Sequence, residues 1–305
     1  MDRRSIASLD VSVLGVGCNN FGMRLDAAET ATVIDGALDL GVNYFDTADM
    51  YGGTKSEEYI GRALKGRRQE AVIATKFGMP LDDNRKGAHP DYMKQACDAS
   101  LQRLQTDYID LYILHTPDPT VPLADTMGAL SDLVVAGKVR EIGCSNFSSE
   151  LLRQADAASH SDGGPRFVNV QNEYSLLKRD DEQDVLPVCA ELGLTYSPYF
   201  PLASGLLTGK YRKGEAFPEG SRLDSIEYFR YNFSDDNMDK VEALVDYAAA
   251  HNHSVLDLAL SWLVAQPNIP SVIAGATSVE QIKANKDAIA WELSPAQLND
   301  IDALT

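Results

Sequence analysis

Short apolar runs alternate along the chain with longer stretches in which apolar residues recur at helical spacing. In the stretch 26–40, for example, Ala27, Ala31, Ile34 and Leu38 share one face of a predicted helix. The apolar runs, each bounded by turn residues, predict strands at 13–17, 42–45, 71–75, 109–114, 139–144, 167–170, 194–197 and 271–274. The helical spacing predicts helices at 26–40, 54–66, 90–104, 123–135, 148–158, 181–192, 235–251, 255–264 and 279–288.

This alternation predicts an α/β protein with a parallel sheet, because each helix must carry the chain back to the start of the next strand. Eight such units close into a (β/α)8 TIM barrel more readily than they form an open sheet of that width. Residues 4–13 are predicted to form an N-terminal β-hairpin. Residues 205–233 have no clear periodicity, and so long a connection after strand 7 favours a functional lid. We expect one domain over residues 1–305.

Composition narrows the possible partners and compartments. The net charge of −18 argues against nucleic acid and anionic membranes as partners. No apolar run is long enough to span a membrane, and no metal-binding motif is visible. The four cysteines have no CxxC spacing, which favours reduced, mostly buried thiols in a cytoplasmic protein.

Polar residues follow several of the apolar strands, at the end where barrel enzymes carry their chemistry. Asp46 ends the second strand and Tyr51 lies five residues further on. Lys76 ends the third strand and His115 follows the fourth. Each of these residues alone also has a structural explanation, such as a salt bridge, a packed ring or a buried core histidine. Together, at the ends of three successive strands, they predict a proton-transfer site.

Several motifs resemble the aldo-keto reductase family. They are GVNYFDTADMYG at 41–52, ATK at 74–76, GCSNF at 143–147, QNEY at 171–174 and LASGLLTGKY at 202–211. They cover nearly the whole chain, in the order that the family shows. The resemblance implies a barrel that binds a nicotinamide dinucleotide without a Rossmann fold, and a catalytic set of Asp46, Tyr51, Lys76 and His115.

The chemistry of these four residue types fits carbonyl reduction. Delivery of a hydride to a carbonyl builds negative charge on oxygen, which must be protonated. Tyr51 has the proton but an ordinary pKa of about 10, and a nearby Lys76 ammonium favours tyrosinate and lowers that pKa. Asp46 holds Lys76 through a charge-assisted hydrogen bond. A neutral His115 donates a hydrogen bond that orients the carbonyl.

The resemblance also implies the cofactor contacts. Ser145, Asn146 and Gln171 would hydrogen-bond the nicotinamide carboxamide, and Tyr199 would stack on its ring. Leu202, Ser204, Lys210 and Arg222 would surround the pyrophosphate, while Gly275, Thr277, Gln281 and Asn285 would hold the adenosine end. Ser278-x-x-Gln281 is a capping-box signature, so a helix N-terminus should favour an anion at that end. We expect NADPH as cofactor, because the family commonly uses it and the Thr277 and Ser278 hydroxyls fall near the expected 2′-phosphate. NADH stays possible, because the neutral Gln281 stands where many family members have an arginine.

The substrate is predicted to be a small molecule with a carbonyl group. Residues beside the catalytic and cofactor positions are expected to line its site: Asn20, Phe21, Met50, Phe77 and Phe200. An aromatic cleft with few fixed charges suits small aldehydes and ketones better than phosphorylated sugars. Two alternatives stay open at this point: a cofactor-sensing regulatory protein of the same fold, and a non-redox lyase or isomerase that uses Tyr51 and Lys76. The sequence leaves the natural substrate, the physiological direction and the oligomeric state open.

Overall fold

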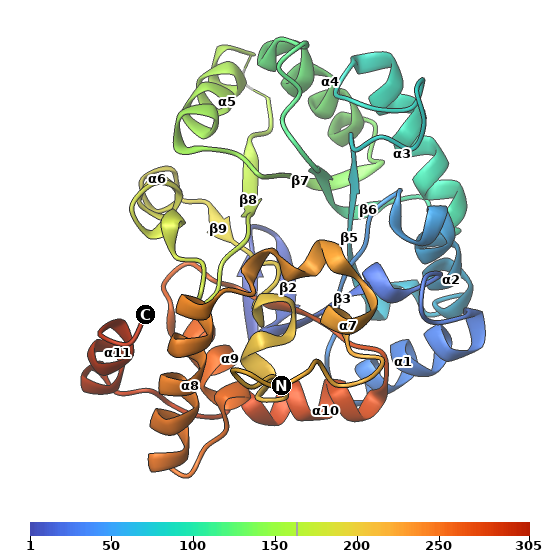
Figure 1. Ribbon diagram of the computed structural model, residues 1–305. Coiled ribbons are helices and arrows are strands. Elements are labelled where there is room, and N and C mark those ends of the chain that lie inside the picture. Colours follow the sequence, from blue (N-terminus) through green and yellow to red (C-terminus); the bar gives the residue numbers. More distant parts are fainter. Residues whose placement is uncertain (163) are drawn as a thin grey trace.

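The computed structural model describes residues 1–162 and 164–305, without the side chains of residues 160–162 and 222. Eight parallel strands form one curled sheet in the order β10-β3-β4-β5-β6-β7-β8-β9 (Figure 1). A backbone hydrogen bond of 2.8 Å from Tyr196 to Asn268 joins the two ends of this order. The (β/α)8 barrel is therefore confirmed. Its strands are β3 (Leu14–Gly17), β4 (Tyr44–Asp46), β5 (Val72–Phe77), β6 (Ile109–Leu114), β7 (Val139–Ser145), β8 (Phe167–Gln171), β9 (Thr195–Tyr196) and β10 (Val272–Gly275).

Helices surround the strands and return the chain to the amino end of the barrel (Figure 1). They are α1 (Ala27–Asp39), α2 (Lys55–Ala63), α3 (Pro90–Leu104), α4 (Leu123–Val135), α5 (Ser149–Asp162), α6 (Val185–Leu192), α7 (Arg222–Ser225), α8 (Asp235–Ala250), α9 (Val255–Ala265), α10 (Val279–Ala288) and α11 (Pro295–Asp302). The first of them shows why the pattern works. Asp26 and Glu29 form a full capping box at its start, and Val33, Ile34 and Ala37 bury its inner face. None of the described helices is long and apolar enough to cross a membrane.

The predicted N-terminal hairpin closes the amino end of the barrel. Strands β1 (Arg3–Ile6) and β2 (Leu9–Ser12) pair antiparallel. Ile6, Leu9 and Val11 are buried against barrel side chains such as Tyr44 and Leu111. Each buried aliphatic side chain contributes about 1.5–3 kcal/mol relative to exposure, so the apolar plug is stable. This leaves the carboxyl ends of the strands as the open end of the barrel.

One helix cap that the sequence pattern suggests does not form. Thr54 and Glu57 have the spacing of a capping box, but Thr54 makes no capping hydrogen bond with its side chain. The Glu57 carboxylate is instead buried, where it accepts hydrogen bonds from Thr75 at 2.5 Å and from Arg103 at 2.7 Å. A buried ion pair to the next helix has displaced the local cap, since a buried carboxylate requires a partner.

The segment after β9 runs over the open end of the barrel. As its lack of periodicity predicted, it holds only short helical turns, η5 (Ala203–Thr208), α7 and η6 (Glu227–Asn232). Residues in or next to each of these three turns line one large cleft at the open end of the barrel, among them Ser204, Ser221 and Tyr231. The short 3-10 helices elsewhere are η1 (Cys18–Asn20), η2 (Tyr51–Thr54), η3 (Arg68–Glu70) and η4 (Asp180–Glu182).

Candidate active site

Three neighbouring strands bring the four predicted catalytic residues together. Asp46 is the last residue of β4, Lys76 lies on β5, and His115 follows β6 directly. Parallel register places the ends of these strands side by side, with Asp46 opposite Ala74. Tyr51 opens the turn η2 that follows β4. Because the strands are parallel, residues that are distant in sequence meet at one edge.

A buried ion pair forms the base of this site. Lys76 Nζ donates to Asp46 Oδ2 at 2.7 Å and to the Thr47 carbonyl at 2.8 Å, and the Lys76 side chain is only 1% exposed. The second oxygen of Asp46 accepts a hydrogen bond of 2.8 Å from Gln171. Burial disfavours the ammonium, but Asp46 and Tyr51 outweigh it and raise the pKa of Lys76. The lysine therefore stays charged beneath Tyr51.

Tyr51 lies directly above the lysine. Lys76 Nζ is 5.1 Å from the centre of its ring. Burial raises the pKa of the Tyr51 hydroxyl, and the Lys76 ammonium opposes that rise without overcoming it. The expected influence of the lysine is present, but the net direction is upward, contrary to the expectation from sequence. Tyr51 consequently keeps its proton at neutral pH, as a proton donor must.

His115 completes the group at the wall of the cleft. Its ring lies edge-on to the Tyr51 ring, with centres 5.9 Å apart. Burial and the nearby Lys76 charge lower the pKa of His115 to about 3. The imidazole is therefore neutral near pH 7, as expected, and can offer one N–H to a ligand.

A cleft of about 1430 Å³ extends from these residues across the open end of the barrel. Asp46, Tyr51 and His115 line it, while Lys76 lies just beneath. Its walls also contain every predicted cofactor residue whose side chain is described: Ser145, Asn146, Gln171, Tyr199, Leu202, Ser204, Lys210, Gly275, Thr277, Gln281 and Asn285. Arg222 begins α7, and its side chain lies outside the described part of the chain. The residues predicted for cofactor binding and those predicted for catalysis thus meet in one cleft.

A hydrogen-bonded network orders the part of the cleft next to His115. Asn146 donates to the His115 carbonyl at 2.9 Å and accepts from the Tyr199 hydroxyl at 2.8 Å. Ser145 Oγ donates to the Gln171 carbonyl at 2.6 Å. Because the Gln171 amide is already bonded to Asp46, Gln171 connects this wall of the cleft to the Lys76–Asp46 ion pair.

The opposite end of the cleft lies at the start of α10. Ser278 is the N-cap and accepts a hydrogen bond from the Gln281 backbone. Only this half of the predicted capping box forms, because the Gln281 side chain accepts instead from the Thr277 backbone at 2.8 Å. The helix N-terminus still faces the cleft through Thr277 and Gln281, and it favours an anion there.

The predicted substrate residues divide into two groups. Asn20, Met50 and Phe200 line the cleft. Phe21 and Phe77 are fully buried in the hydrophobic core, so their assignment as cleft residues is wrong. Phe77 follows Lys76 on the same strand and therefore points to the opposite face, where it stacks on Tyr112.

Sequence analysis missed several residues of the cleft. These are Arg24, Met79, Glu173 and Glu219. Tyr228 and Tyr231 also line the cleft, and they belong to the segment 205–233 that was expected to form a lid. Glu173 lies within the QNEY motif, and it accepts hydrogen bonds from Tyr231 and from Asn232, the latter at 3.2 Å. The expectation of few fixed charges is thus only partly met, since Arg24, Lys210, Glu173 and Glu219 all reach the cleft.

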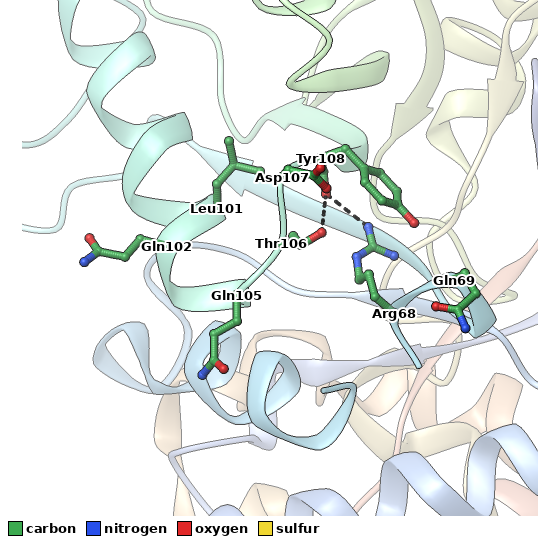
Figure 2. A pocket seen from close by; sticks show the side chains of 8 residues that line it. All are labelled: Arg68, Gln69, Leu101, Gln102, Gln105, Thr106, Asp107 and Tyr108. Atoms are coloured by element: carbon green, nitrogen blue, oxygen red, sulfur yellow. Dashed lines mark hydrogen bonds between the residues drawn. The ribbon is translucent and has the colours of Figure 1, made fainter. Parts of the chain in front are cut away.

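A second, shallower pocket lies at the amino ends of β5 and β6 (Figure 2). Arg68 dominates it, with its guanidinium 4.2 Å from the centre of the Tyr108 ring. Arg68 also donates to the Tyr108 carbonyl at 3.2 Å and to Asp110 at 2.5 Å. Both terminal nitrogens of Arg68 are thus bonded to groups at the starts of β5 and β6, which indicates a structural role at this end of the barrel.

Comparison with known proteins agrees with this geometry. The model of the aldo/keto reductase family matches residues 13–305. The chain is 35% identical over 300 residues to the probable aldo-keto reductase 1 of Glycine max, covering 96% of this chain and 85% of that protein. It is also 35% identical over 331 residues to the protein tas of Escherichia coli (strain K12), covering 98% of this chain and 95% of that protein. The chain therefore belongs to the aldo/keto reductase family of oxidoreductases.

Proposed function

We propose that this protein reduces aldehydes and ketones to alcohols with NADPH, and that Tyr51 is the general acid. One observation carries the proposal: a protonated Tyr51 lies over a buried Lys76–Asp46 pair and beside a neutral His115, at one end of a cleft large enough for a dinucleotide.

The residues of the cleft fit a nicotinamide dinucleotide. Asn146 and Ser145 offer amide and hydroxyl groups next to His115, and Tyr199 offers an aromatic face. Lys210 supplies a positive charge to the cleft, and the α10 N-terminus supplies backbone N–H groups. When bound there, the dinucleotide would supply the hydride.

The protein's own residues would then manage the proton. Tyr51 donates its proton to the carbonyl oxygen as negative charge develops on that atom. The tyrosinate left behind is stabilised by the Lys76 ammonium, which Asp46 keeps charged. His115, which stays neutral, directs its N–H at the carbonyl oxygen and orients it.

The cofactor preference follows from the far end of the cleft. The α10 N-terminus and the Thr277 hydroxyl favour a phosphate, whereas Gln281 brings no charge. We expect NADPH to bind about tenfold more tightly than NADH, which corresponds to about 1.4 kcal/mol. Competitive titration of the two reduced cofactors tests this preference, and tighter binding of NADH would contradict it.

Turnover separates the proposal from its two alternatives. A panel of small aldehydes and ketones, followed by NADPH absorbance, should show steady consumption of cofactor. Cofactor binding without turnover would favour a sensing protein, and activity without nucleotide would favour a lyase or isomerase. We also propose a cytoplasmic location, supported by four free, buried cysteines. A single-domain organisation stays a prediction, in keeping with a core cluster that runs from Leu14 to Ile301.

A further inference from the structure

Asp49 is a buried acid that the proposed reaction does not use. It lies two residues before Tyr51, and its side chain is 0% exposed. Among the described residues, neither of its carboxyl oxygens has a hydrogen-bond partner. Its backbone N–H donates to the Lys76 carbonyl at 3.0 Å, which places Asp49 against the strand that carries the catalytic lysine. The loop that pairs Asp46 with Lys76 thus leaves its second acid unpaired.

The cations near Asp49 are already bonded to other groups. Arg103, on α3, donates to the buried carboxylate of Glu57 at 2.7 Å. Lys76 donates to Asp46 and to a backbone carbonyl. An ionised Asp49 would therefore be a buried charge without a bonded counter-charge, beside a second negative charge on Glu57. Such a charge is strongly unfavourable in a folded protein, so the geometry favours the neutral acid.

The other polar groups around Asp49 carry no charge. The hydroxyls of Tyr92, on α3, and Tyr112, on β6, are buried without a partner in the described part of the chain, and both interact electrostatically with Asp49. Burial first, and then repulsion from Glu57, raise the pKa of Asp49 to about 7, although Arg103 pulls in the opposite direction. The carboxyl group therefore changes its charge within the ordinary working range of pH.

We propose that Asp49 is a positioning residue: the turn that carries Tyr51 keeps its place while the buried Asp49 carboxyl is neutral, and ionisation of that carboxyl displaces the turn. The ionised carboxylate would need a counter-charge, and the nearby cations, Lys76 and Arg103, are bonded to Asp46 and Glu57. The strain is transmitted through Met50, which lines the cleft, to Tyr51. This inference rests on the proposed function, because Tyr51 is the group that the turn positions.

The test is the pH profile of kcat for aldehyde reduction by the wild-type enzyme, Asp49→Asn and Asp246→Asn. Asparagine mimics the neutral acid, and Asp246 is an exposed residue of α8 that controls for the loss of one charge. With a pKa of about 7, the neutral fraction of Asp49 falls about tenfold between about pH 6 and pH 8. The wild type and Asp246→Asn should lose kcat by about that factor, and Asp49→Asn should not.

Parallel profiles for all three proteins would overturn the inference. A second measurement decides the matter even where Asp49→Asn does not fold: carbon-13 NMR of aspartate carboxyls in the wild-type holoenzyme. Titration of the Asp49 carboxyl together with the loss of kcat supports the inference, while titration near pH 4 refutes it. If the wild type reduces no carbonyl compound, the proposed function fails; the inference then stands or falls on whether Tyr51 ring signals shift as Asp49 titrates.

Discussion

Replacement of Lys76 by methionine should separate the structural role of the buried pair from its catalytic role. Lys76→Met removes the ammonium but keeps a chain of similar length. Asp46 is then left as a buried carboxylate that retains only its hydrogen bond from Gln171. The Asp46→Asn and Lys76→Met double variant removes both charges. We expect the double variant to recover stability that the single variant loses, but not activity.

The magnitudes follow from the geometry of the pair. At the 2.7 Å separation of Lys76 Nζ and Asp46 Oδ2, with an effective dielectric constant of about 20, the attraction is roughly 6 kcal/mol. The cost of removing both groups from water offsets part of this attraction, whereas loss of one partner leaves a bare buried charge. Lys76→Met should therefore destabilise the fold by about 3–5 kcal/mol. The free energy of unfolding of the double variant should be about 1–3 kcal/mol higher than that of Lys76→Met.

Two assays follow the prediction. Urea unfolding gives the free energy of unfolding of each protein, and NADPH consumption with an aldehyde gives kcat at several pH values. In Lys76→Met the pKa of Tyr51 rises further, because the ammonium that opposes the rise is gone. Its kcat should fall by about 10²-fold or more, and the added Asp46→Asn change should lower it little further. Strictly additive losses of both stability and activity would refute the coupling.

Three further changes test other parts of the cleft. Gln281→Arg should widen the preference for NADPH over NADH by about tenfold, since a guanidinium pairs with the 2′-phosphate; an unchanged ratio of dissociation constants would place that phosphate elsewhere. Because the pKa of His115 is about 3, the wild-type profile of kcat/KM against pH should have no inflection near pH 6.5 that comes from His115. An inflection there that is lost in His115→Gln would contradict this prediction. The same shift predicts that acidification from about pH 6.5 toward 3 destabilises the fold, because the unfolded chain takes up the His115 proton first. Arg24 lines the cleft without an ion-pair partner among the described residues, so Arg24→Gln should lower kcat/KM about tenfold for an aldehyde that carries a carboxylate and leave its neutral ester unaffected.

Much of the fold was predictable because periodicity reports burial. The helix expected at 279–288 and that at 123–135 match α10 and α4 to the residue. Helix α11 (Pro295–Asp302) was not predicted, since it buries only Ile301 fully and has almost no apolar face. The strand expected at 194–197 shrinks to Thr195–Tyr196, because only this short piece keeps the parallel ladder with β8.

The candidate site was predictable where position alone decides it. A residue at the end of a barrel strand faces the cleft or the core according to alternation. This rule separates Lys76 from Phe77, and Phe77 was misassigned because neighbourhood in sequence was used in place of alternation. Contacts made in three dimensions left no such signal. The ion pair of Glu57 with Arg103 and the net direction of the Tyr51 pKa both depend on burial by segments distant in sequence. The unpaired state of Asp49 was unpredictable for the same reason, since nothing in its sequence neighbourhood indicates that its carboxyl lacks a partner.

The central claim is that Tyr51 donates the proton in a carbonyl reduction. Tyr51→Phe keeps the ring over Lys76 and removes only the hydroxyl, so the measurement that tests the claim most directly pairs its NADPH affinity with its turnover of an aldehyde panel. The account predicts near-normal binding of NADPH and a fall in kcat of about 10²-fold or more. Retention of most of the turnover on every aldehyde would contradict it.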